Sequence, residues 1–379
     1  MSRIDLALVA LQLGLMKQRK YCKPLAVSIL TLAMSASGLF AELRLYLANR
    51  HDDTLARYDL DEASGDLTLR QTLKLEGQPA PMCVSPDERV LYVAQRKAEK
   101  VTALAISPKD GSLKVIAETD LPGKGGACYV STDRSGRFLL SAYYAAGKVT
   151  VHRLNKNGAV GKGALQTVVT EQKAHCILTD YQNRLALVPH TGPNAVYQFR
   201  FDAKTGKLSP AKPAKHLPKE TLSPRHVAFH PNEKFVYVVN EGSSSVTACR
   251  LKADAIHPIH TLSTLPKGFA ERNSCADVEV HPSGKFLYCS NRGHDSIAMF
   301  TIDQKTARLT AIGQSATEEM PRSFNVDPTG KFLVAAGLRA NKVTVYRIDQ
   351  GTGKLKPLKT YETGKGPTWV QILKQKQDG

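Results

Sequence analysis

The sequence lacks the short motifs that mark several common catalytic and cofactor sites. It contains no His-Glu-x-x-His, no Cys-x-x-Cys, no Gly-x-Ser-x-Gly and no glycine loop that would cradle a phosphate. Zinc hydrolases, serine hydrolases and nucleotide-binding proteins therefore have no motif to support them. The cysteines also show no metal-ligand spacing. We expect a protein that uses neither a metal nor an organic cofactor.

Acidic residues are scarce relative to basic ones. The 379 residues include 34 Asp and Glu against 52 Lys and Arg, which gives a formal net charge of +18. Such a field favours anionic small molecules, nucleic acid or an anionic surface. The lysines lie in scattered turns, such as 97–100 and 212–219, with few aromatic residues among them, which makes a poor platform for stacked bases. We therefore expect an anionic small molecule as the partner, and no nucleic acid.

An apolar run of secretory length occurs only near the N-terminus. Residues 24–41 are apolar or small and follow a cluster of four cations, Lys17, Arg19, Lys20 and Lys23. This pattern predicts a signal peptide over residues 1–41; Met16 would be its natural start, so residues 1–15 are interpreted as an upstream mis-start. No later segment reaches membrane-spanning length. We expect the mature chain, 42–379, in the periplasm or secreted, with no membrane association after cleavage; anchoring by this stretch is the alternative.

Six of the seven cysteines follow the predicted signal peptide: Cys83, Cys128, Cys176, Cys249, Cys275 and Cys289. An even number in an exported chain permits disulfide bonds. The positions are scattered without close pairs, however, and a core of this size needs no covalent crosslinks. We expect mostly buried thiols.

One unit recurs seven times after the apolar run. Each copy has a short apolar segment, a turn such as His-Pro or Asp-Pro, a strand such as Phe-Val-Tyr-Val-Val-Asn, and a second alternating strand. Aligning the middle strands puts seven residues in register at intervals of 46 to 51: Tyr46, Tyr92, Leu140, Leu187, Tyr237, Tyr288 and Val334. No segment has a helical period, so each copy predicts a small antiparallel sheet. Four-stranded sheets repeated at about 40–50 residues are typical of propeller blades.

The two ends of the chain predict that the array closes into a ring. The first middle strand, 43–49, has no inner partner before it, while the chain finishes with an unpaired strand at 368–373. The last strand can supply the missing inner strand of the first blade and remove the open edge. The alternative, an open solenoid, would need capping units, and none is visible. The prediction is an all-β, seven-bladed β-propeller whose N- and C-terminal strands share one blade.

Propeller geometry brings certain repeat positions together at one mouth of the central channel. The first residue of each inner strand meets the last residues of the strand that returns beside it. Five polar residues occupy these positions in blades four to seven: His175, Arg225, Glu241, Arg292 and Arg322. Fixed cations, hydrogen-bond donors for a developing oxyanion and a base for water are what hydrolysis of an anionic ester requires. The alternative interpretation is that Arg225 and Glu241 form an ordinary ion pair between adjacent strands and have no catalytic role.

We assign His175, Arg225, Glu241 and Arg292 to catalysis, and a wider set to substrate binding: Arg322, His226, Asn240, Asn291 and Asp277. His226 and Asp277 are each next in sequence to a mouth residue. They would point the opposite way and support the site from behind. Arginine stays cationic, so the base is Glu241 or His175.

Several segments carry a resemblance to a known family. They include Ser-Pro-Arg-His-Val-Ala-Phe-His-Pro (223–231), Val-Tyr-Val-Val-Asn-Glu (236–241), Ala-Asp-Val-Glu-Val-His-Pro-Ser-Gly-Lys-Phe-Leu-Tyr-Cys-Ser-Asn-Arg (276–292), Pro-Arg-Ser-Phe-Asn-Val-Asp-Pro-Thr-Gly-Lys-Phe-Leu (321–333) and Gly-Pro-Thr-Trp-Val (366–370). This run resembles the propeller lactonases, of the bacterial 6-phosphogluconolactonase and 3-carboxy-cis,cis-muconate lactonizing enzyme type. The resemblance implies lactone hydrolysis or closure without a metal. It also implies that the family's active-site residues fall on His175, Arg225, Glu241 and Arg292.

Three functions remain open from the sequence. The first is an exported, metal-independent lactonase acting on an anionic sugar lactone of the 6-phosphogluconolactone type, as a monomer. The second is a catalytically silent propeller that binds a sugar acid or peptide at the same mouth. The third is a propeller that binds a protein partner, since Val-Tyr-Val-Val-Asn also fits surface propellers. For the base we favour Glu241, because its motif resembles the family more closely than the segment around His175.

Overall fold

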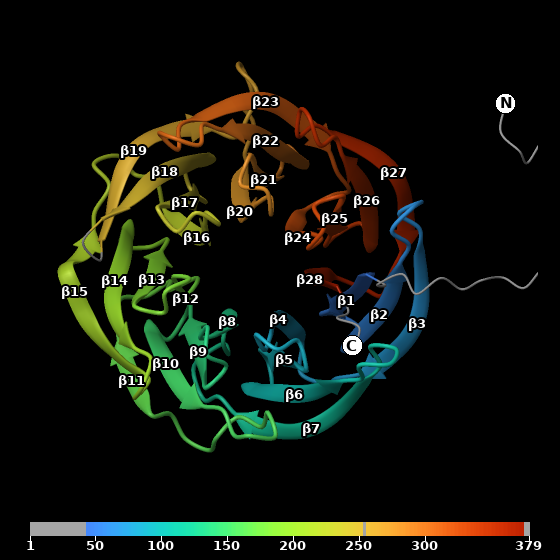
Figure 1. The fold of residues 1–379 in the computed structure, drawn as a ribbon, viewed down its shortest axis with the longest axis vertical. Helices are drawn as coiled ribbons and strands as arrows, with labels where there is room; N and C mark the ends of the chain where they lie inside the picture. The colour runs from blue at the N-terminus through green and yellow to red at the C-terminus, as the bar shows by residue number, and fades with distance from the viewer. Residues whose placement is uncertain (1–42, 253–254, 375–379) are drawn as a thin grey trace, which may run out of the picture. The chain divides into compact units, whose positions relative to one another are not determined.

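The computed structural model describes residues 43–252 and 255–374, and every regular element in them is a β-strand. The predicted signal peptide (1–41), including the interpretation of residues 1–15, lies outside the described residues. The strands form seven four-stranded antiparallel sheets. Figure 1 shows the sheets arranged as blades around a central axis. The predicted seven-bladed propeller is confirmed.

The blades are numbered from the N-terminus, and each is given from its inner to its outer strand. Blade one contains β28 (Pro367–Lys374), β1 (Leu43–Asn49), β2 (Thr54–Leu60) and β3 (Leu67–Lys74). Blade two contains β4 (Pro79–Val84), β5 (Val90–Gln95), β6 (Lys100–Ile106) and β7 (Leu113–Asp120). Blade three contains β8 (Tyr129–Thr132), β9 (Phe138–Tyr143), β10 (Lys148–Arg153) and β11 (Gln166–Val169). Blade four contains β12 (Leu178–Thr179), β13 (Leu185–His190), β14 (Ala195–Asp202) and β15 (Lys207–His216).

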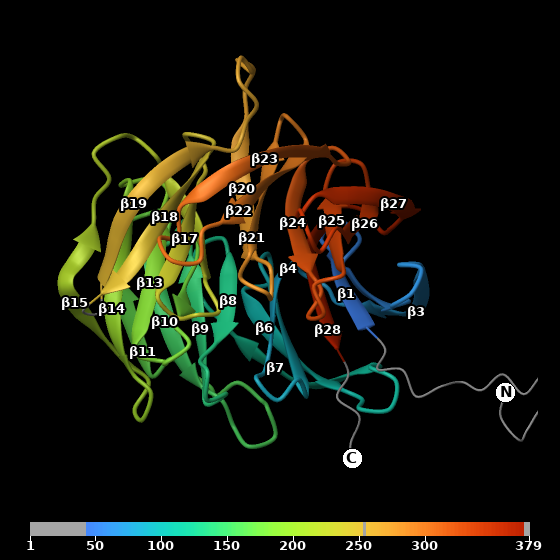
Figure 2. The same cartoon turned by 45° about the horizontal axis from the view of Figure 1, so that its top comes forward.

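The remaining three blades follow the same order. Blade five contains β16 (Pro224–Phe229), β17 (Phe235–Asn240), β18 (Ser245–Lys252) and β19 (Ala255–Ser263). Blade six contains β20 (Ser274–Val280), β21 (Phe286–Arg292), β22 (Ser296–Ile302) and β23 (Leu309–Ala316). Blade seven contains β24 (Pro321–Val326), β25 (Phe332–Gly337), β26 (Lys342–Ile348) and β27 (Leu355–Glu362). Figure 2 shows the same blades after the molecule is turned about the horizontal axis of Figure 1.

Blade one closes the ring as predicted. The C-terminal strand β28 pairs antiparallel with β1, from Leu43 opposite Lys374 to Asn49 opposite Pro367. Both termini of the propeller therefore belong to one sheet, and the inner edge of β1 is covered. Closure leaves no exposed strand edge between the first and last blades.

The alternation of apolar residues explains which strand lies where in a blade. The second strand of each blade, such as β5, is buried along its whole length because it packs against a neighbouring blade on both faces. Outer strands such as β3 bury few residues and expose most of the others. The core lies between blades: Leu45 of blade one, Val334 of blade seven and Val370 of the closing strand belong to one apolar cluster.

The inner strand of blade four is the shortest of the seven inner strands. β12 covers only Leu178–Thr179. Its partner strand carries Pro189, which has no N–H to donate to a ladder. His175 N still donates to Pro189 O at 3.0 Å, and Ala174 forms an isolated bridge with His190. His175 is thus held beside the strand rather than in it.

All six cysteines in the described residues are free thiols, and all but the half-buried Cys83 are buried. The predicted buried thiols are confirmed. Within the same residues no helix is long and apolar enough to cross a membrane.

Candidate active site

A β-bulge at the start of the inner strands directs two arginines into the mouth of the channel. In blade five, Pro224 pairs with Asn240 and His226 with Val239, so Arg225 is the extra residue. In blade seven, Arg322 is the extra residue between Pro321 and Ser323 in the same way. A bulge re-aims a side chain that regular alternation would send elsewhere. Arg225 and Arg322 line one narrow cavity of about 10 Å³, which has room for a single water-sized group.

The strand that returns beside each inner strand contributes the rest of the mouth. Glu241 follows the last residue of β17, and its N–H donates to Ser223 O at 2.8 Å. Arg50 and Arg96 occupy the equivalent position in blades one and two, where their N–H groups donate to Gly366 O and Gln78 O. Arg292 ends β21 in blade six. The mouth therefore carries one carboxylate, that of Glu241, and five arginines: Arg50, Arg96, Arg225, Arg292 and Arg322.

In blades five and six, the residue just before Glu241 or Arg292 is an asparagine. Its side chain points away from the mouth and makes hydrogen bonds inside the blade. Asn240 Nδ2 donates to Ser245 Oγ and Thr247 Oγ1, both at 2.9 Å. Asn291 Nδ2 donates to Thr264 O at 3.0 Å. Successive residues of an extended strand point to opposite sides. The structure therefore places the amides of Asn240 and Asn291 inside the blades, apart from the arginines of the mouth.

Glu241 lies between two arginines from different blades. Its Oε1 is 3.0 Å from Arg292 Nη2, and its Oε2 is 3.3 Å from Arg225 Nε. Burial raises the pKa of Glu241, but Arg225 and Arg292 more than offset that effect, so its pKa is lower than usual. Glu241 is thus an ionised carboxylate at neutral pH. Oε2 is buried and, beyond its ion pair with Arg225, makes no hydrogen bond among the described residues.

Arg225 and Arg292 are themselves held by backbone carbonyls. Arg225 Nη1 donates to Ala276 O, and Arg292 Nη2 donates to Cys275 O at 2.8 Å. Both guanidinium groups are buried to more than nine-tenths. Burial, followed by the neighbouring Arg292, lowers the pKa of Arg225 to about 10, so it remains charged at neutral pH. The cations are fixed before a ligand arrives, which is the arrangement that stabilises developing negative charge well.

His226 contacts Nη1 of Arg225, whereas Glu241 contacts its Nε, and Asp277 contacts His226. His226 Nδ1 is 2.9 Å from Asp277 Oδ1, and His226 Nε2 is 3.1 Å from Arg225 Nη1. Both residues line a second cavity in the channel, of about 350 Å³. Neither His226 nor Asp277 lines the narrow cavity that Arg225 and Arg322 share. His226 contacts Arg225 and is itself held by Asp277, so the pair is placed to position Arg225.

His175 lies in blade four, beside the arginine mouth. It is 5% exposed, and its ring contacts Tyr144 and His226 edge to face at centroid distances of 5.4 and 5.1 Å. Burial, Arg225, His226 and Arg322 hold the pKa of His175 well below its ordinary value. The imidazole is therefore neutral, and its Nδ1 has no hydrogen-bond partner among the described residues.

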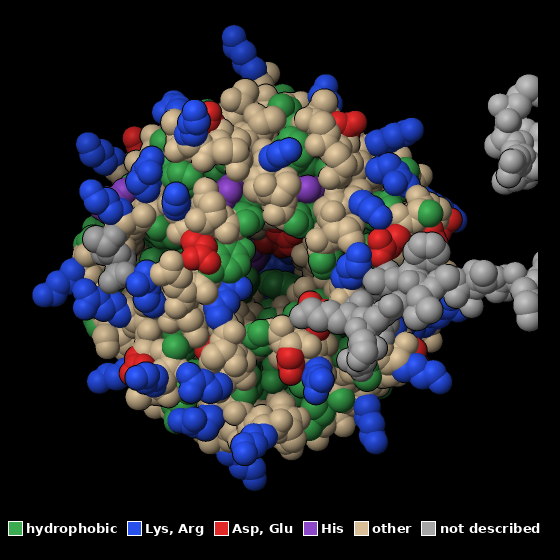
Figure 3. All heavy atoms as spheres, viewed as in Figure 1, with side chains coloured by type: hydrophobic (Ala, Val, Ile, Leu, Met, Phe, Trp, Pro, Cys, Tyr) green, Lys and Arg blue, Asp and Glu red, His purple; other side chains and the backbone are tan. Residues whose placement is uncertain are grey.

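Two aromatic rings and His226 divide the channel into its two cavities. Trp369 lines both of them, and Tyr129 lines the wider one. The two rings meet edge to face at 5.5 Å, and Tyr129 meets His226 at 5.1 Å. Figure 3 shows the opening of the channel on one face, with acidic, basic and apolar side chains around it. On that face Lys and Arg are spread around the rim and form no single basic patch.

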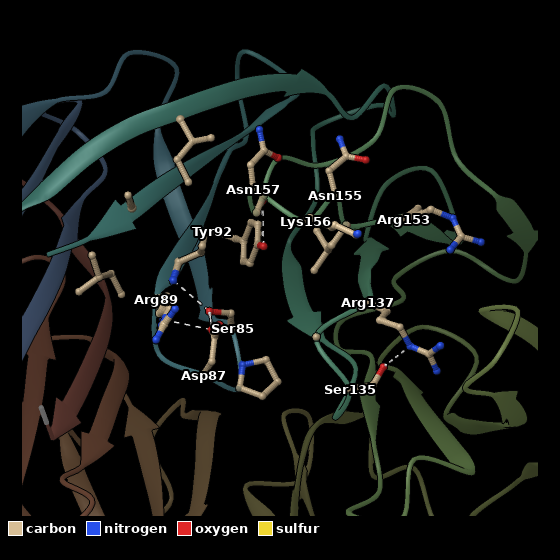
Figure 4. Close-up of a pocket in the computed structure, with 18 of the residues that line it drawn as sticks. Ser85, Asp87, Arg89, Tyr92, Ser135, Arg137, Arg153, Asn155, Lys156 and Asn157 are labelled. Carbon is tan, nitrogen blue, oxygen red and sulfur yellow. Dashed lines mark hydrogen bonds between the residues drawn. The ribbon is translucent and has the colours of Figure 1, made fainter. Parts of the chain in front are cut away.

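A much larger cavity lies at the periphery, away from the channel. It has a volume of about 1030 Å³ and lies between blades two and three, where Figure 4 shows Arg89, Arg137 and Arg153 around it. Val90 stands where four of the other blades have phenylalanine: Val90 faces Gly158 as Phe138 faces Gly206. The smaller side chain leaves space at this blade junction. Its three arginines are exposed, and no histidine lines it.

Sequence reasoning missed two of the five arginines. Arg50 and Arg96 stand in register with Glu241, so the repeat places them at the same mouth, whereas the predicted site contained only residues of blades four to seven. The predicted set His175, Arg225, Glu241, Arg292 and Arg322 lies around one mouth. Among residues 43–252 and 255–374, no group of three His, Cys, Asp or Glu side chains is arranged to hold a metal ion.

Comparison with known proteins assigns the family. Residues 46–372 match the family model described as lactonase, 7-bladed beta-propeller. The chain belongs to this family. It is 36% identical over 330 residues to a 6-phosphogluconolactonase of Erwinia tasmaniensis, covering 87% of this chain and 98% of that one. It is 38% identical over 310 residues to a 6-phosphogluconolactonase of an Enterobacter species, covering 81% and 92%. The resemblance predicted from the sequence is confirmed.

Solved structures share the fold at lower identity. A periplasmic gluconolactonase from Pseudomonas aeruginosa superposes with a TM-score of 0.80 at 21% identity, covering 88% of this chain and 99% of that one. A protein from Lactobacillus plantarum has the same TM-score at 24% identity, covering 88% and 100%. At these identities the likeness supports the propeller architecture alone.

Proposed function

We propose that this chain is an exported lactonase that hydrolyses an anionic sugar lactone, of the 6-phosphogluconolactone type, at the arginine mouth of the channel. The observation that carries the proposal is Glu241 held between Arg225 and Arg292 beside His175. The names of the curated relatives support lactone hydrolysis. Export rests on the predicted signal peptide over residues 1–41.

The proposed reaction is the attack of water on the lactone carbonyl. Glu241 takes one proton from water while the water oxygen bonds to the carbonyl carbon. The carbonyl oxygen becomes an oxyanion, which Arg225 and Arg292 stabilise electrostatically. The ring C–O bond then breaks, and the leaving ring oxygen takes the proton from Glu241. The product is the open-chain hydroxy acid, and Glu241 returns to its ionised form.

Glu241 suits the role of base better than His175. Protonation of His175 would add a cation next to Arg225 and Arg322, which disfavour it. Glu241 is ionised, and its Oε2 makes no hydrogen bond among the described residues beyond the ion pair with Arg225. Its low pKa makes it a weak base, but lactones open fairly readily in water, so a modest acceleration suffices. We assign His175 to hydrogen bonding with the substrate as a neutral imidazole.

The test is an assay of purified residues 42–379 against a panel of lactones. Acid release would be followed for 6-phosphogluconolactone, gluconolactone and a simple neutral lactone, each corrected for spontaneous opening. We expect turnover of a sugar lactone that falls strongly in Glu241→Gln and not in the exposed control Arg308→Gln. Binding of the sugar acid without turnover of any lactone would overturn the proposal in favour of a silent binding propeller.

A further inference from the structure

One packing unit recurs where neighbouring blades meet. In four blades the second strand begins with a phenylalanine. The ring of Phe138 lies so close to Gly206 of the next blade that a Cβ atom built on this glycine would be 2.6 Å from it. Across the strand pair Phe138 faces Arg153, whose guanidinium lies 5.4 Å from the centre of the ring. The same pair recurs in two other blades: Phe235 with Arg250, and Phe332 with Arg347.

Blade two lacks both side chains of this unit. Val90 stands at the phenylalanine position, and its partner across the strand pair is Ala105 instead of an arginine. The turn of the next blade is retained, since Tyr92 still donates to Gly158 O at 2.9 Å. Val90 and Ala105 both line the peripheral cavity of about 1030 Å³. That cavity therefore includes the space that a ring and an arginine fill at other blade junctions.

The walls of the cavity combine apolar and cationic side chains. Ile106, Ile116 and Leu154 line it together with Val90, and all four are buried or half-buried. Among the described residues that line it, Asp87 is the one acid, against four cations: Arg89, Arg137, Arg153 and Lys156. Walls of this kind favour a ligand that is apolar on one side and anionic on the other.

Two of the four cations have no protein partner. The other two are engaged by neighbours: Arg137 Nη2 donates to Ala203 O, and Arg153 lies over the ring of Phe138. Arg89 and Lys156 are exposed, and their side chains make no hydrogen bond or ion pair within the described part of the chain. Figure 4 shows them at different sides of the cavity, with Tyr92 between them in that view. They are the cations available to a ligand.

The register of the repeat predicts what Arg89 contacts. Arg89 precedes Val90 as Arg137 precedes Phe138, and the Arg137 guanidinium lies 5.8 Å from the centre of the Phe138 ring. A ring in the empty place beside Val90 would therefore come within cation–π range of Arg89. The guanidinium also donates to anionic oxygens, so a charged group attached to that ring strengthens the contact.

We propose that the cavity between blades two and three is a binding site for a small aromatic anion. Its ring would lie against Val90 and Leu154, and its carboxylate or sulfonate would lie toward Arg89 and Lys156. A volume of about 1030 Å³ is at the upper end for small-molecule sites, which leaves room for fused or linked rings. Of the described residues that line this cavity, none also lines either channel cavity. The inference is therefore independent of the proposed lactonase activity.

The first experiment uses a fluorescent aromatic anion, 8-anilinonaphthalene-1-sulfonate, as the probe. It would be titrated into folded residues 42–379 while its emission is followed. We expect binding that weakens about 10- to 100-fold in Val90→Phe, because the new side chain takes the place of one buried ring. Val90→Leu, which introduces the residue of blades one and four, should have an intermediate effect.

The fold of these variants is checked by their Tm. Val90→Phe restores the residue found in four other blades, so its Tm should equal or exceed that of the parent. Unchanged probe affinity in folded Val90→Phe, or in Val90→Leu if the larger residue prevents folding, would overturn the site.

The charge of the ligand is tested separately. The double variant Arg89→Gln/Lys156→Gln should weaken binding of the sulfonate about 5- to 30-fold, since each contact open to solvent contributes up to about fivefold. N-phenyl-1-naphthylamine has the same rings without the sulfonate, and its affinity should fall by a smaller factor. Lys285→Gln is the matched control, because Lys285 precedes Phe286 at a junction that a ring already fills. Equal losses for the two probes would overturn the preference for an anion.

Two further results would identify a different occupant. A dimer of the parent that Val90→Phe dissociates, seen by analytical ultracentrifugation, would mean that a second copy of the chain fills the cavity, and would reject the small-ligand site. Binding of neither probe to the parent would show that water alone fills the cavity, and would also overturn the proposal.

Discussion

His226 Nδ1 lies 2.9 Å from Asp277 Oδ1, and this pair holds the imidazole with Nε2 toward Arg225. Burial and Arg225 lower the pKa of His226 to about 4 despite the carboxylate beside it. The ring is therefore neutral. Since Nδ1 donates to Asp277, Nε2 is the acceptor for the Arg225 N–H. A carboxylate in blade six thus orients, through His226, an arginine of the neighbouring blade five.

The first prediction concerns this orientation. Asp277→Asn leaves the size of the side chain unchanged but removes the charge that selects the His226 tautomer. We expect kcat/KM to fall about five- to tenfold, since one hydrogen bond contributes about 1 kcal/mol. Steady-state kinetics with a sugar lactone measure the change, and Asp87→Asn at the periphery is the matched control. Equal kinetics in Asp277→Asn and the parent would show that Arg225 needs no such support.

The second prediction distinguishes Glu241 from His175. Glu241→Gln should lower kcat by about 10²–10⁴, the usual cost of losing a general base, while His175→Asn should cost less. The pKa values of both groups lie below their ordinary values, so kcat/KM should stay level between about pH 6.5 and 8. A pH-rate profile corrected for spontaneous lactone opening measures this. An acid limb near pH 6.5 that disappears in His175→Asn would make His175 the base.

The third prediction is an acid-sensitive fold. Burial lowers the pKa values of His190 and His226 to about 4, against about 6.5 in the unfolded chain. The unfolded state binds more protons in this window, so the free energy of unfolding decreases as pH falls from about 6.5 to 4. Each unit of pKa difference corresponds to about 1.4 kcal/mol. Urea unfolding at pH 7.5, 6 and 5 measures the slope.

Matched histidine variants test the source of that slope. His190→Gln should make the stability of the protein less dependent on pH, and replacement of the exposed His257 should not. A free energy of unfolding that is constant from pH 7.5 to 5 would contradict the burial of neutral histidines.

The fourth prediction concerns the thiols. Burial raises the pKa values of Cys128, Cys249 and Cys275, and these thiols are free and buried. A thiol reacts as its thiolate, so we expect no rapid reaction with a disulfide reagent in the folded protein. Six thiols should react after unfolding of residues 42–379. Recovery of fewer than six, with the remainder released by a reductant, would reveal a disulfide bond.

The fifth prediction concerns ring closure. Removing residues 367–379 deletes β28, which covers β1 and whose Ile372 N–H bonds to Asn325 of blade seven at 2.6 Å. We expect this truncation to abolish cooperative unfolding, because it exposes an inner edge and the apolar faces of two blades. Removing only residues 375–379 should leave the Tm unchanged. Differential scanning calorimetry compares the two, and a cooperative transition in the longer truncation would contradict the prediction.

The repeat made the architecture predictable, while the details of the mouth depend on local departures from it. Register of the seven middle strands placed Arg225, Glu241 and Arg292 near one another. Period-two alternation alone would not show that a bulge turns Arg225 into the mouth, because a bulge depends on how both strands pair. The asparagines were assigned to the mouth because Asn240 adjoins Glu241. Their bonds to Ser245 and Thr264 could not be foreseen without the packing inside each blade.

Trp369 is the single tryptophan of the chain, and it lines both cavities of the channel. All the indole fluorescence of the protein therefore originates at the boundary between the arginine mouth and the wider cavity. A ligand entering from either end changes the surroundings of that one ring, and release of β28 exposes it to water. The unlabelled protein thus contains its own optical reporter, so that ligand entry and opening of the ring can be followed in real time by stopped-flow emission at a known position.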